Sequence, residues 1–355
     1  MSSHPCALIM AGGTGGHIFP GLAVAQALRD KGWRVHWLGT PGSMESELVP
    51  GRGFALETIE FGGLRGKGLK TLAWLPWRLL KALGQSAAVM RRVRPDVVLG
   101  MGGYVSFPGG VMAYLSGSAL VLHEQNSVAG MANRWLSKLA KQVFTAFPHV
   151  MPGAQWVGNP LRQAFTQQAS PAQRFAGRSG VLKVLVVGGS LGAKALNDVV
   201  PQALALLPEA ERPQVIHQSG AKQIEALRAN YQAAGVQAEL TPFIDDTASA
   251  FAQADLIVCR AGASTVTEIA AVGAAALFVP FPFAVDDHQT TNAQFLVQQG
   301  GGWLMPQAQL TAATLAAQWR TMTRGELLSR AEAAWAQKKT QATHDVVTAC
   351  EELAR

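Results

Sequence analysis

Two glycine-rich segments are well suited to binding chemistry, because each follows a short apolar run and precedes a helical pattern. They read Gly12-Gly13-Thr14-Gly15-Gly16-His17 and Gly188-Gly189-Ser190-Leu191-Gly192. Backbone N–H groups between a strand and a helix N-terminus can bind an anion, and glycine lets the backbone approach a ligand closely. The same glycines could instead only tighten two strand-to-helix turns. Their repetition at matching positions favours binding of an anion such as a nucleotide phosphate.

The spacing of the first loop argues against two common nucleotide-binding classes. The third glycine of a dinucleotide fingerprint would fall at position 18, which is Ile18. A Walker A loop needs Gly-Lys-Ser or Gly-Lys-Thr, and neither occurs in the chain. An NAD-dependent dehydrogenase and a P-loop ATPase are therefore disfavoured.

A third segment, 260–268, reads Arg-Ala-Gly-Ala-Ser-Thr-Val-Thr-Glu after another apolar run. Ser264 or Thr265 is expected to cap the helix that follows, with Glu268 one turn inside it. The functional alternative places this helix N-terminus against a phosphate. Glu268 would then hold a pair of hydroxyls, since a carboxylate accepts two hydrogen bonds from a vicinal diol.

Short apolar runs and helical patterns alternate along both halves of the chain, which predicts an α/β fold with parallel sheets covered on both faces. The pattern restarts after Gly158-Asn159-Pro160, so we expect two Rossmann-like domains, residues 1–161 and residues 162–334. The expected strands are 6–11, 34–38, 97–100, 119–122, 183–187, 213–218 and 255–259.

Composition and charge narrow the function classes further. The 355 residues are 48% apolar and 15% charged, so the chain can bury a large core and is not mainly disordered. Residues 1–161 carry a net charge of +8 and the remainder −1. Eight basic residues and no acid lie between Glu60 and Asp96, which predicts an anionic partner such as phosphate, nucleic acid or lipid. Three widely spaced cysteines exclude a disulfide framework and a Cys-x-x-Cys metal site.

Six motifs, in order along the whole chain, closely resemble those of the MurG family of bacterial glycosyltransferases. They are Gly-Gly-Thr-Gly-Gly-His at 12–17, Gly-Gly-Tyr-Val-Ser at 102–106, His-Glu-Gln-Asn at 123–126, Gly-Asn-Pro-Leu-Arg at 158–162, Gly-Gly-Ser-Leu-Gly-Ala at 188–193, and the segment 260–268. The resemblance implies a GT-B fold, in which two Rossmann-like domains face each other across a cleft. It also implies that the last helix, roughly 334–353, returns to the first domain, which would then include a C-terminal segment of about 335–355. Trp335, Val346, Val347, Ala349 and Cys350 would be available for packing.

The reaction implied by the resemblance transfers N-acetylglucosamine from UDP-GlcNAc to lipid I, the undecaprenyl-diphosphate-linked MurNAc-pentapeptide. The C4 hydroxyl of N-acetylmuramic acid attacks C1 of the donor sugar, UDP leaves, and the α linkage becomes β in lipid II. The matched positions would share the donor: Ile244 and Arg162 at the uracil, Glu268 at the ribose, Ser190 at the α-phosphate, Asn126 and Gln289 at the sugar hydroxyls, and Thr14, Gly15, Gly16, Ala263, Ser264, Thr265, Val266 and Thr267 around the diphosphate and sugar.

His17 is the expected general base, because an imidazole titrates near working pH and could take the proton from the attacking hydroxyl. The alternative is that His17 only positions a phosphate or supports the turn. Glu124 is the second candidate base, although beside His123 it could equally belong to a structural pair.

Apolar and basic residues alternate around the start of a predicted helix, as expected of a surface that binds anionic lipid. The expected membrane-contact residues are Leu64, Lys70, Leu72, Trp74, Leu75, Trp77, Arg78 and Lys81. The alternatives are an amphipathic helix packed on the sheet and, with no recognisable motif to support it, nucleic-acid binding.

The resemblance implies a peripheral enzyme on the cytoplasmic face of the plasma membrane that needs no cofactor. No Asp-x-Asp pair occurs, although this leaves Mg²⁺ open. Contacts with other cell-wall enzymes are also left open, and no nucleic-acid partner is expected. The rival readings are a UDP-sugar 2-epimerase of the same fold and an inactive lipid- or nucleotide-binding module.

Overall fold

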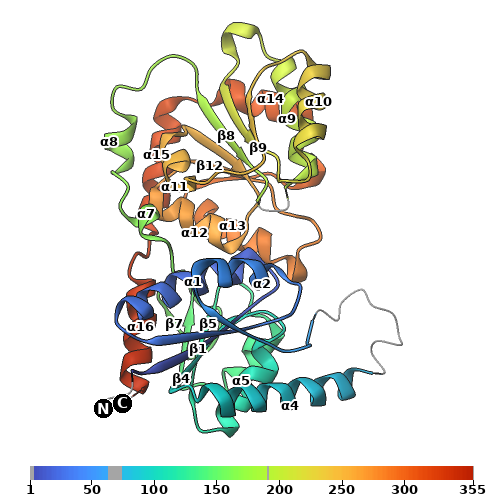
Figure 1. The fold of residues 1–355 in the computed structure, drawn as a ribbon. Coiled ribbons are helices and arrows are strands. Elements are labelled where there is room, and N and C mark those ends of the chain that lie inside the picture. Colours follow the sequence, from blue (N-terminus) through green and yellow to red (C-terminus); the bar gives the residue numbers. More distant parts are fainter. Residues whose placement is uncertain (1–3, 63–73, 190–191, 355) are drawn as a thin grey trace. The chain divides into compact units, whose positions relative to one another are not determined.

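The computed structural model describes residues 4–62, 74–189 and 192–354. The chain forms two compact units (Figure 1). Unit 1 consists of residues 1–161 and 340–355, and unit 2 consists of residues 162–339.

Unit 1 is built on a parallel sheet of seven strands. The four strands predicted for this half are confirmed, two of them extended by two residues at the carboxyl end. In spatial order the strands are β3 (Ala55–Thr58), β2 (Arg34–Gly39), β1 (Cys6–Ala11), β4 (Val97–Gly102), β5 (Ala119–Glu124), β6 (Gln142–Thr145) and β7 (Gln155–Trp156).

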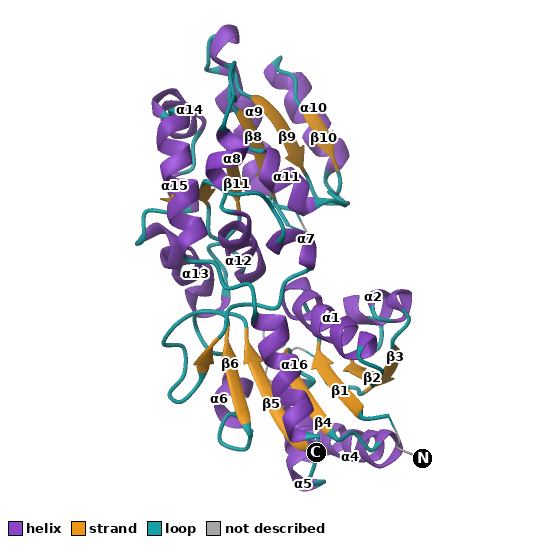
Figure 2. Ribbon diagram, turned by 90° about the vertical axis from the view of Figure 1, so that its left-hand side faces the viewer, coloured by secondary structure: helices purple, strands orange, loops and turns teal. Residues whose placement is uncertain are grey.

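Helices cover both faces of this sheet, as Figures 1 and 2 show. On one face, α1 (Gly15–Asp30) and α16 (Ala342–Leu353) pack against Ala7 and Ile9 of β1. On the other, α4 (Leu75–Val93), α5 (Ser106–Leu115) and α6 (Met131–Leu136) pack against Leu8 and Met10. Successive side chains of a strand point to opposite faces, so an uninterrupted apolar run is what a strand buried on both faces requires. The short helices α2 (Met44–Leu48) and η1 (Pro50–Arg52) follow β2.

The last helix returns to unit 1 as expected, but its expected start at 334 is wrong. Helix α15 (Arg324–Ala336) ends in unit 2, residues 337–341 are not helical, and α16 then packs Val346, Val347 and Cys350 into the core of unit 1. Trp335 therefore belongs to α15, where its side chain lies against Gly273. Residues 335–339 belong to unit 2, so the predicted limit at 334 falls five residues early.

Unit 2 contains a parallel sheet of six strands, and the three strands predicted here are confirmed. In spatial order they are β10 (Glu239–Thr241), β9 (Gln214–Gln218), β8 (Lys183–Val187), β11 (Leu256–Cys259), β12 (Ala276–Phe278) and β13 (Gly302–Leu304). The main core of the unit lies between this sheet and the helices α9 (Lys194–Ala205), α10 (Ile224–Ala234), α14 (Ala312–Thr321) and α15.

Four of the other helices of unit 2 lie in contact with one another, and the helix Pro171–Phe175 contacts α15 instead. These other helices are α7 (Gln163–Thr166), α8 (Pro171–Phe175), α11 (Thr247–Gln253), α12 (Ala263–Val272) and α13 (His288–Val297), with single turns η2 (Glu209–Glu211), η3 (Val285–Asp287) and η4 (Gln307–Gln309).

Both sheets reverse their strand order once. In unit 1 the chain first adds β2 and β3 on one side of β1 and then returns to add β4 on the other side. In unit 2 the same reversal occurs between β8 and β11. Connections leave in opposite directions at such a point, so the carboxyl ends of the two strands open a crevice where ligands of this fold class bind.

None of the helices in the described parts of the chain is long and apolar enough to cross a membrane. The stretch 97–122, which contains no charged residue, forms β4, α5 and the start of β5.

Candidate active site

In unit 1 the reversal point brings two glycine pairs into backbone contact. Gly12-Gly13 follows β1, and Gly102-Gly103 lies at the end of β4. Gly103 has φ +90°, and a Cβ there would lie 2.5 Å from the carbonyl oxygen of Gly12. A side chain at position 103 would block this approach, so Gly103 is needed to bring the first loop against the Gly-Gly-Tyr segment.

His17 lies in the first turn of α1 and is half-buried beside this contact. Its Nδ1 is 3.2 Å from the Gly12 carbonyl oxygen and 3.4 Å from the Thr14 hydroxyl. A carbonyl can only accept, so Nδ1 carries the proton in this contact and the Thr14 hydroxyl can accept as well. The neutral ring then has its lone pair on Nε2, the form that can accept a proton. A Cβ on Gly102 would lie 2.9 Å from Nε2, so this glycine leaves room for that edge of the ring.

Glu124, at the end of β5, is buried and accepts hydrogen bonds at both carboxylate oxygens. Oε1 accepts from the Asn126 backbone N–H at 3.0 Å and its amide at 3.4 Å, and Oε2 accepts from Gly130 N–H at 3.0 Å and Asn133 Nδ2 at 2.8 Å. These four donors hold the turn 125–130 against the strand. The geometry favours a positioning role for Glu124 over that of a base, with Asn126 as the residue positioned.

His123 is not paired with Glu124. Its Nε2 donates to the Gly158 carbonyl oxygen at 2.8 Å, and its Nδ1 accepts from the Gln125 amide at 3.1 Å. Burial lowers the pKa of His123 to about 4, so the ring stays neutral at working pH. The two motif residues therefore hold different segments in place. His123 binds the chain at Gly158, and Glu124 binds the turn that contains Asn126.

In unit 2 the second glycine loop also lies at the reversal point. A Cβ on Gly192, which has φ +76°, would lie 2.1 Å from the Ser219 carbonyl oxygen after β9. The Gln218 amide donates to the Gly189 carbonyl oxygen at 3.0 Å. The expected phosphate ligand Ser190 lies outside the described residues.

The expected cap of α12 is wrong, because the helix begins at Ala263 with Gly262 as its N-cap and without a side-chain cap. Ser264 and Thr265 therefore lie inside the first turn. Thr267 and Val266 are buried, and the Thr267 hydroxyl donates to the carbonyl oxygens of Ala263 and Ser264. These two side chains serve the helix and its packing, and the expected contact of the two residues with the donor stays a prediction.

Glu268 is half-buried on α12. Burial raises the pKa of its carboxyl to about 7, and the positive charge of Arg162 partly opposes this shift. Arg162 precedes α7 and places its guanidinium 5.0 Å from the centre of the Phe165 ring. Arg162 and Glu268, which were expected at the uracil and at the ribose of the donor, thus both belong to unit 2, and their charges interact.

Gln289 and Ile244, the other expected donor residues of unit 2, both take part in hydrogen bonds between a side chain and the backbone. Gln289 lies in the first turn of α13, and its Oε1 accepts from the N–H groups of Phe281 at 2.9 Å and Ala261 at 3.3 Å. The carbonyl of half-buried Ile244 accepts from the Thr247 hydroxyl at 3.1 Å. Gln289 therefore joins the chain after β12 to the chain after β11, at the carboxyl edge of the sheet.

The start of α4 carries the expected membrane residues that the structure describes. Trp74, Trp77 and Leu80 are exposed by 63%, 65% and 62%. Leu75, another expected contact, is partly buried and packs against the core beneath α4. The remaining expected contacts, Leu64, Lys70 and Leu72, lie outside the described residues.

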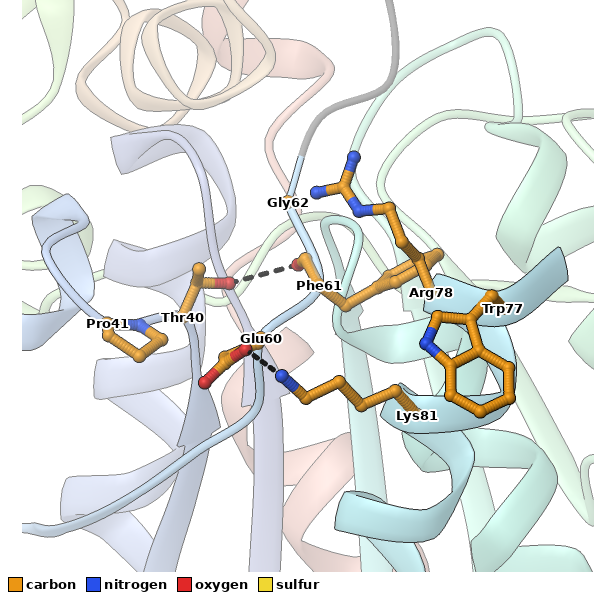
Figure 3. A pocket seen from close by; sticks show the side chains of 8 residues that line it. All are labelled: Thr40, Pro41, Glu60, Phe61, Gly62, Trp77, Arg78 and Lys81. Atoms are coloured by element: carbon orange, nitrogen blue, oxygen red, sulfur yellow. Dashed lines mark hydrogen bonds and ion pairs between the residues drawn. The ribbon is translucent and has the colours of Figure 1, made fainter. Parts of the chain in front are cut away.

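A pocket of about 460 Å³ adjoins this helix, lined on one side by Trp77, Arg78 and Lys81 (Figure 3). The opposite side comes from the segments after β2 and β3, where Lys81 pairs with Glu60 and the Thr40 hydroxyl donates to the Phe61 carbonyl at 3.2 Å. Both basic side chains thus stand beside an exposed tryptophan.

Among the described residues, no group of three or more His, Cys, Asp or Glu side chains is placed to hold a metal ion.

Comparison with known proteins identifies the family. The glycosyltransferase family 28 N-terminal domain matches residues 7–145, and the family 28 C-terminal domain matches residues 183–347. A protein of Polaromonas naphthalenivorans is 68% identical over 359 residues, which cover 100% of both chains. One of Acidovorax sp. (strain JS42) is 68% identical over 98% of this chain and 88% of its own. Both are named UDP-N-acetylglucosamine--N-acetylmuramyl-(pentapeptide) pyrophosphoryl-undecaprenol N-acetylglucosamine transferase.

Solved structures agree with this assignment. The crystal structure of Acinetobacter baumannii MurG matches with a TM-score of 0.85 and 40% identity, over 98% of this chain and 99% of that one. The glycosyltransferase of kitacinnamycin matches over 99% of both chains with a TM-score of 0.69 but only 17% identity, so it supports the GT-B fold alone. The chain belongs to glycosyltransferase family 28 and, within that family, to the MurG enzymes.

Proposed function

We propose that the protein transfers N-acetylglucosamine from UDP-GlcNAc to the C4 hydroxyl of N-acetylmuramic acid in lipid I, which gives lipid II for peptidoglycan synthesis. The observation that carries this proposal is the 68% identity over the whole chain to relatives named for that reaction. The site agrees with it, because both glycine loops lie at the reversal points of their sheets. A UDP-sugar 2-epimerase is not favoured, since none of the relatives described above is named for that reaction.

In this proposal unit 2 binds the donor. The ribose hydroxyls would donate two hydrogen bonds to ionised Glu268, Arg162 would lie at the uracil, and Ser190 with the α12 N-terminus would meet the diphosphate. Backbone N–H groups fixed before the reaction stabilise charge that develops on a leaving group without reorganisation. This gives a leaving-group site that needs no metal.

Unit 1 supplies the base. As the C4 oxygen of the acceptor forms its bond to C1 of the donor sugar, the C1–oxygen bond to UDP breaks and Nε2 of His17 takes the hydroxyl proton. One displacement at C1 inverts the linkage from α to β. The Nδ1–H contact with Gly12 supports this role, because it puts the proton of the neutral ring on Nδ1 and makes Nε2 the basic nitrogen.

The exposed start of α4 is proposed to contact the membrane that carries the lipid acceptor, on its cytoplasmic face. Trp74, Trp77 and Leu80 would enter the interface, while Arg78 and Lys81 would meet anionic headgroups. The Lys81–Glu60 pair is exposed on both sides, so exchanging Glu60 for a lipid phosphate costs little.

The transfer reaction itself is tested with radiolabelled UDP-GlcNAc and a short-chain lipid I analogue. Label should move into the lipid product, and the rate should be the same in EDTA because the leaving group is stabilised by the protein. Loss of transfer in EDTA would overturn metal independence alone. A 2-epimer of the donor, or binding without turnover, would contradict the proposed reaction.

Replacing the base should act on turnover rather than on donor binding. His17→Ala is expected to lower kcat by about 10²-fold or more, with the donor KM little changed, because only proton transfer in the transition state is lost. His4→Ala, which removes an exposed imidazole of the same unit, is the control. A change confined to KM would instead assign His17 to phosphate positioning.

The raised pKa of Glu268 predicts pH-dependent binding of the nucleoside. Below about pH 7 the carboxyl is mostly protonated and accepts the diol poorly, so uridine affinity should rise on the order of tenfold from pH 6 to pH 8. Uridine is the suitable probe for calorimetry because it carries no phosphate that titrates in this range. Glu268→Gln should bind weakly at both pH values, and a wild-type affinity independent of pH would contradict the ribose contact.

The membrane surface is tested with vesicles that contain anionic lipid. Trp74→Ser with Trp77→Ser should weaken vesicle binding several-fold because two interfacial aromatic anchors are removed. Turnover of a soluble acceptor should stay unchanged. Phe283→Ser removes an 80% exposed aromatic side chain from unit 2 and is the matched control. Equal vesicle binding by the double variant and the control would refute the assignment.

A further inference from the structure

Glu45 is a fully buried carboxylate that points into the first glycine loop. It lies on the two-turn segment α2–η1 after β2, and its side chain is inaccessible to solvent. Oε2 accepts from the Gly13 backbone N–H at 3.1 Å, and Oε1 accepts from the Thr40 N–H at 3.0 Å. A buried charge persists only when such donors replace its lost hydration.

The backbone around Glu45 is shaped to hold it. A Cβ on Gly12 would lie 2.5 Å from Oε1, and a Cβ on Gly39 would lie 2.6 Å from Cγ. Both glycines therefore leave the space that this one side chain fills. The carboxylate occupies the position beside a glycine-loop N–H where a nucleotide-binding turn would hold a phosphate.

One peptide unit joins Glu45 to His17. The N–H of the Gly12–Gly13 peptide donates to Glu45, and the carbonyl of the same peptide accepts from Nδ1 of His17 at 3.2 Å. A negative charge on the N–H side polarises the peptide and makes its carbonyl a better acceptor, since hydrogen bonds in a chain strengthen one another. The stronger contact favours the proton on Nδ1, and hence the lone pair on Nε2.

We propose that Glu45 is a positioning residue for His17, acting through the Gly12–Gly13 peptide as a carboxylate–peptide–imidazole relay. Glu45 does not touch substrate. It fixes the orientation of the peptide and the tautomer of the ring, and it occupies the Gly13 N–H so that no external anion binds there. The inference rests on the proposed function only in taking His17 as the base.

The second glycine loop provides the contrast. The contacts described at Gly189 and Gly192 are with Gln218, Ser219 and Gln223, which are neutral. In the parts of the two loops that the structure describes, they share a place in the fold but differ in charge, because the first holds an internal anion. In the proposed function the second meets the diphosphate of the donor.

The test compares Glu45→Gln with Glu47→Gln, which makes the same charge change at an exposed position of the same helix. Glu45→Gln keeps the size of the side chain but turns an amide NH₂ toward one of the two N–H donors. We expect kcat to fall by about tenfold or more. The donor KM and the uridine affinity should stay within about twofold, because neither depends on proton transfer. Glu47→Gln should match the wild type.

A spectroscopic readout makes the test independent of turnover. In protein labelled with ¹⁵N-histidine, the His17 signals, assigned by their loss in His17→Ala, should report the Nδ1–H tautomer in the wild type and in Glu47→Gln. Glu45→Gln should shift them toward the Nε2–H tautomer. If the wild type lacks transferase activity but Glu45→Gln still shifts the His17 signals relative to the wild type, the proposed function fails and the relay stands.

Two outcomes would overturn the relay. One is an unchanged His17 tautomer in folded Glu45→Gln, whatever happens to kcat, since a lower kcat alone would then reflect a structural role. The other is a wild-type kcat in Glu45→Gln. Melting temperatures of all variants separate these outcomes from a general loss of folding.

Discussion

The backbone contact between Gly103 and Gly12 is the constraint on which the site of unit 1 depends. It exists because β1 and β4 are neighbours that run parallel, so that the chain leaving each must pass the other at the same edge of the sheet. With a side chain at position 103 the two segments could not approach, because a Cβ would lie 2.5 Å from a carbonyl oxygen. The approach fixes the Gly12–Gly13 peptide, and that peptide in turn holds His17 on one side and Glu45 on the other.

The same architecture in the two units serves different chemistry in our proposal. Both units place a glycine loop where the strand order reverses, which is where this fold class binds ligands. Unit 1 fills its loop with a carboxylate and holds a half-buried imidazole beside it, an arrangement suited to proton transfer. Unit 2 surrounds its loop with amides and backbone carbonyls, and it adds a half-buried carboxylate on α12, an arrangement suited to a nucleotide. Polar side chains at these edges are therefore fixed by hydrogen bonds before any substrate arrives.

The exposed surface at the start of α4 arises because some side chains of this helix pack on the core while others remain outside. Leu75 and Leu79 contact the core beneath, so the sheet takes one stripe of the helix. Trp74, Trp77 and Leu80 are left outside beside Arg78 and Lys81. Large exposed aromatics next to cations are costly on a surface that meets only water, and they suit an interface with anionic lipid.

The family and seven of the strands could be predicted from the sequence, whereas the short strands β3, β6, β7, β10, β12 and β13 were not predicted. Strands such as 6–11 and 183–187 are continuous apolar runs because burial on both faces demands it, and glycine motifs at their ends are local features. Two predictions about where helices begin or end were wrong. The capping pattern at 260–268 predicted a side-chain cap on α12, which instead begins after Gly262, and the family resemblance implied one helix over 334–353, where residues 337–341 are not helical.

Only the tertiary structure decided the partners of the polar groups. It separated His123 from Glu124 although they are adjacent in sequence, and it brought Glu45 to a loop 32 residues earlier in the chain. Nothing in the segment around Glu45 marks it, because its acidic neighbour Glu47 is exposed and the two look alike in sequence. Strand order places distant segments at one edge of a sheet, and a hydrogen bond formed there depends on that order rather than on any local pattern.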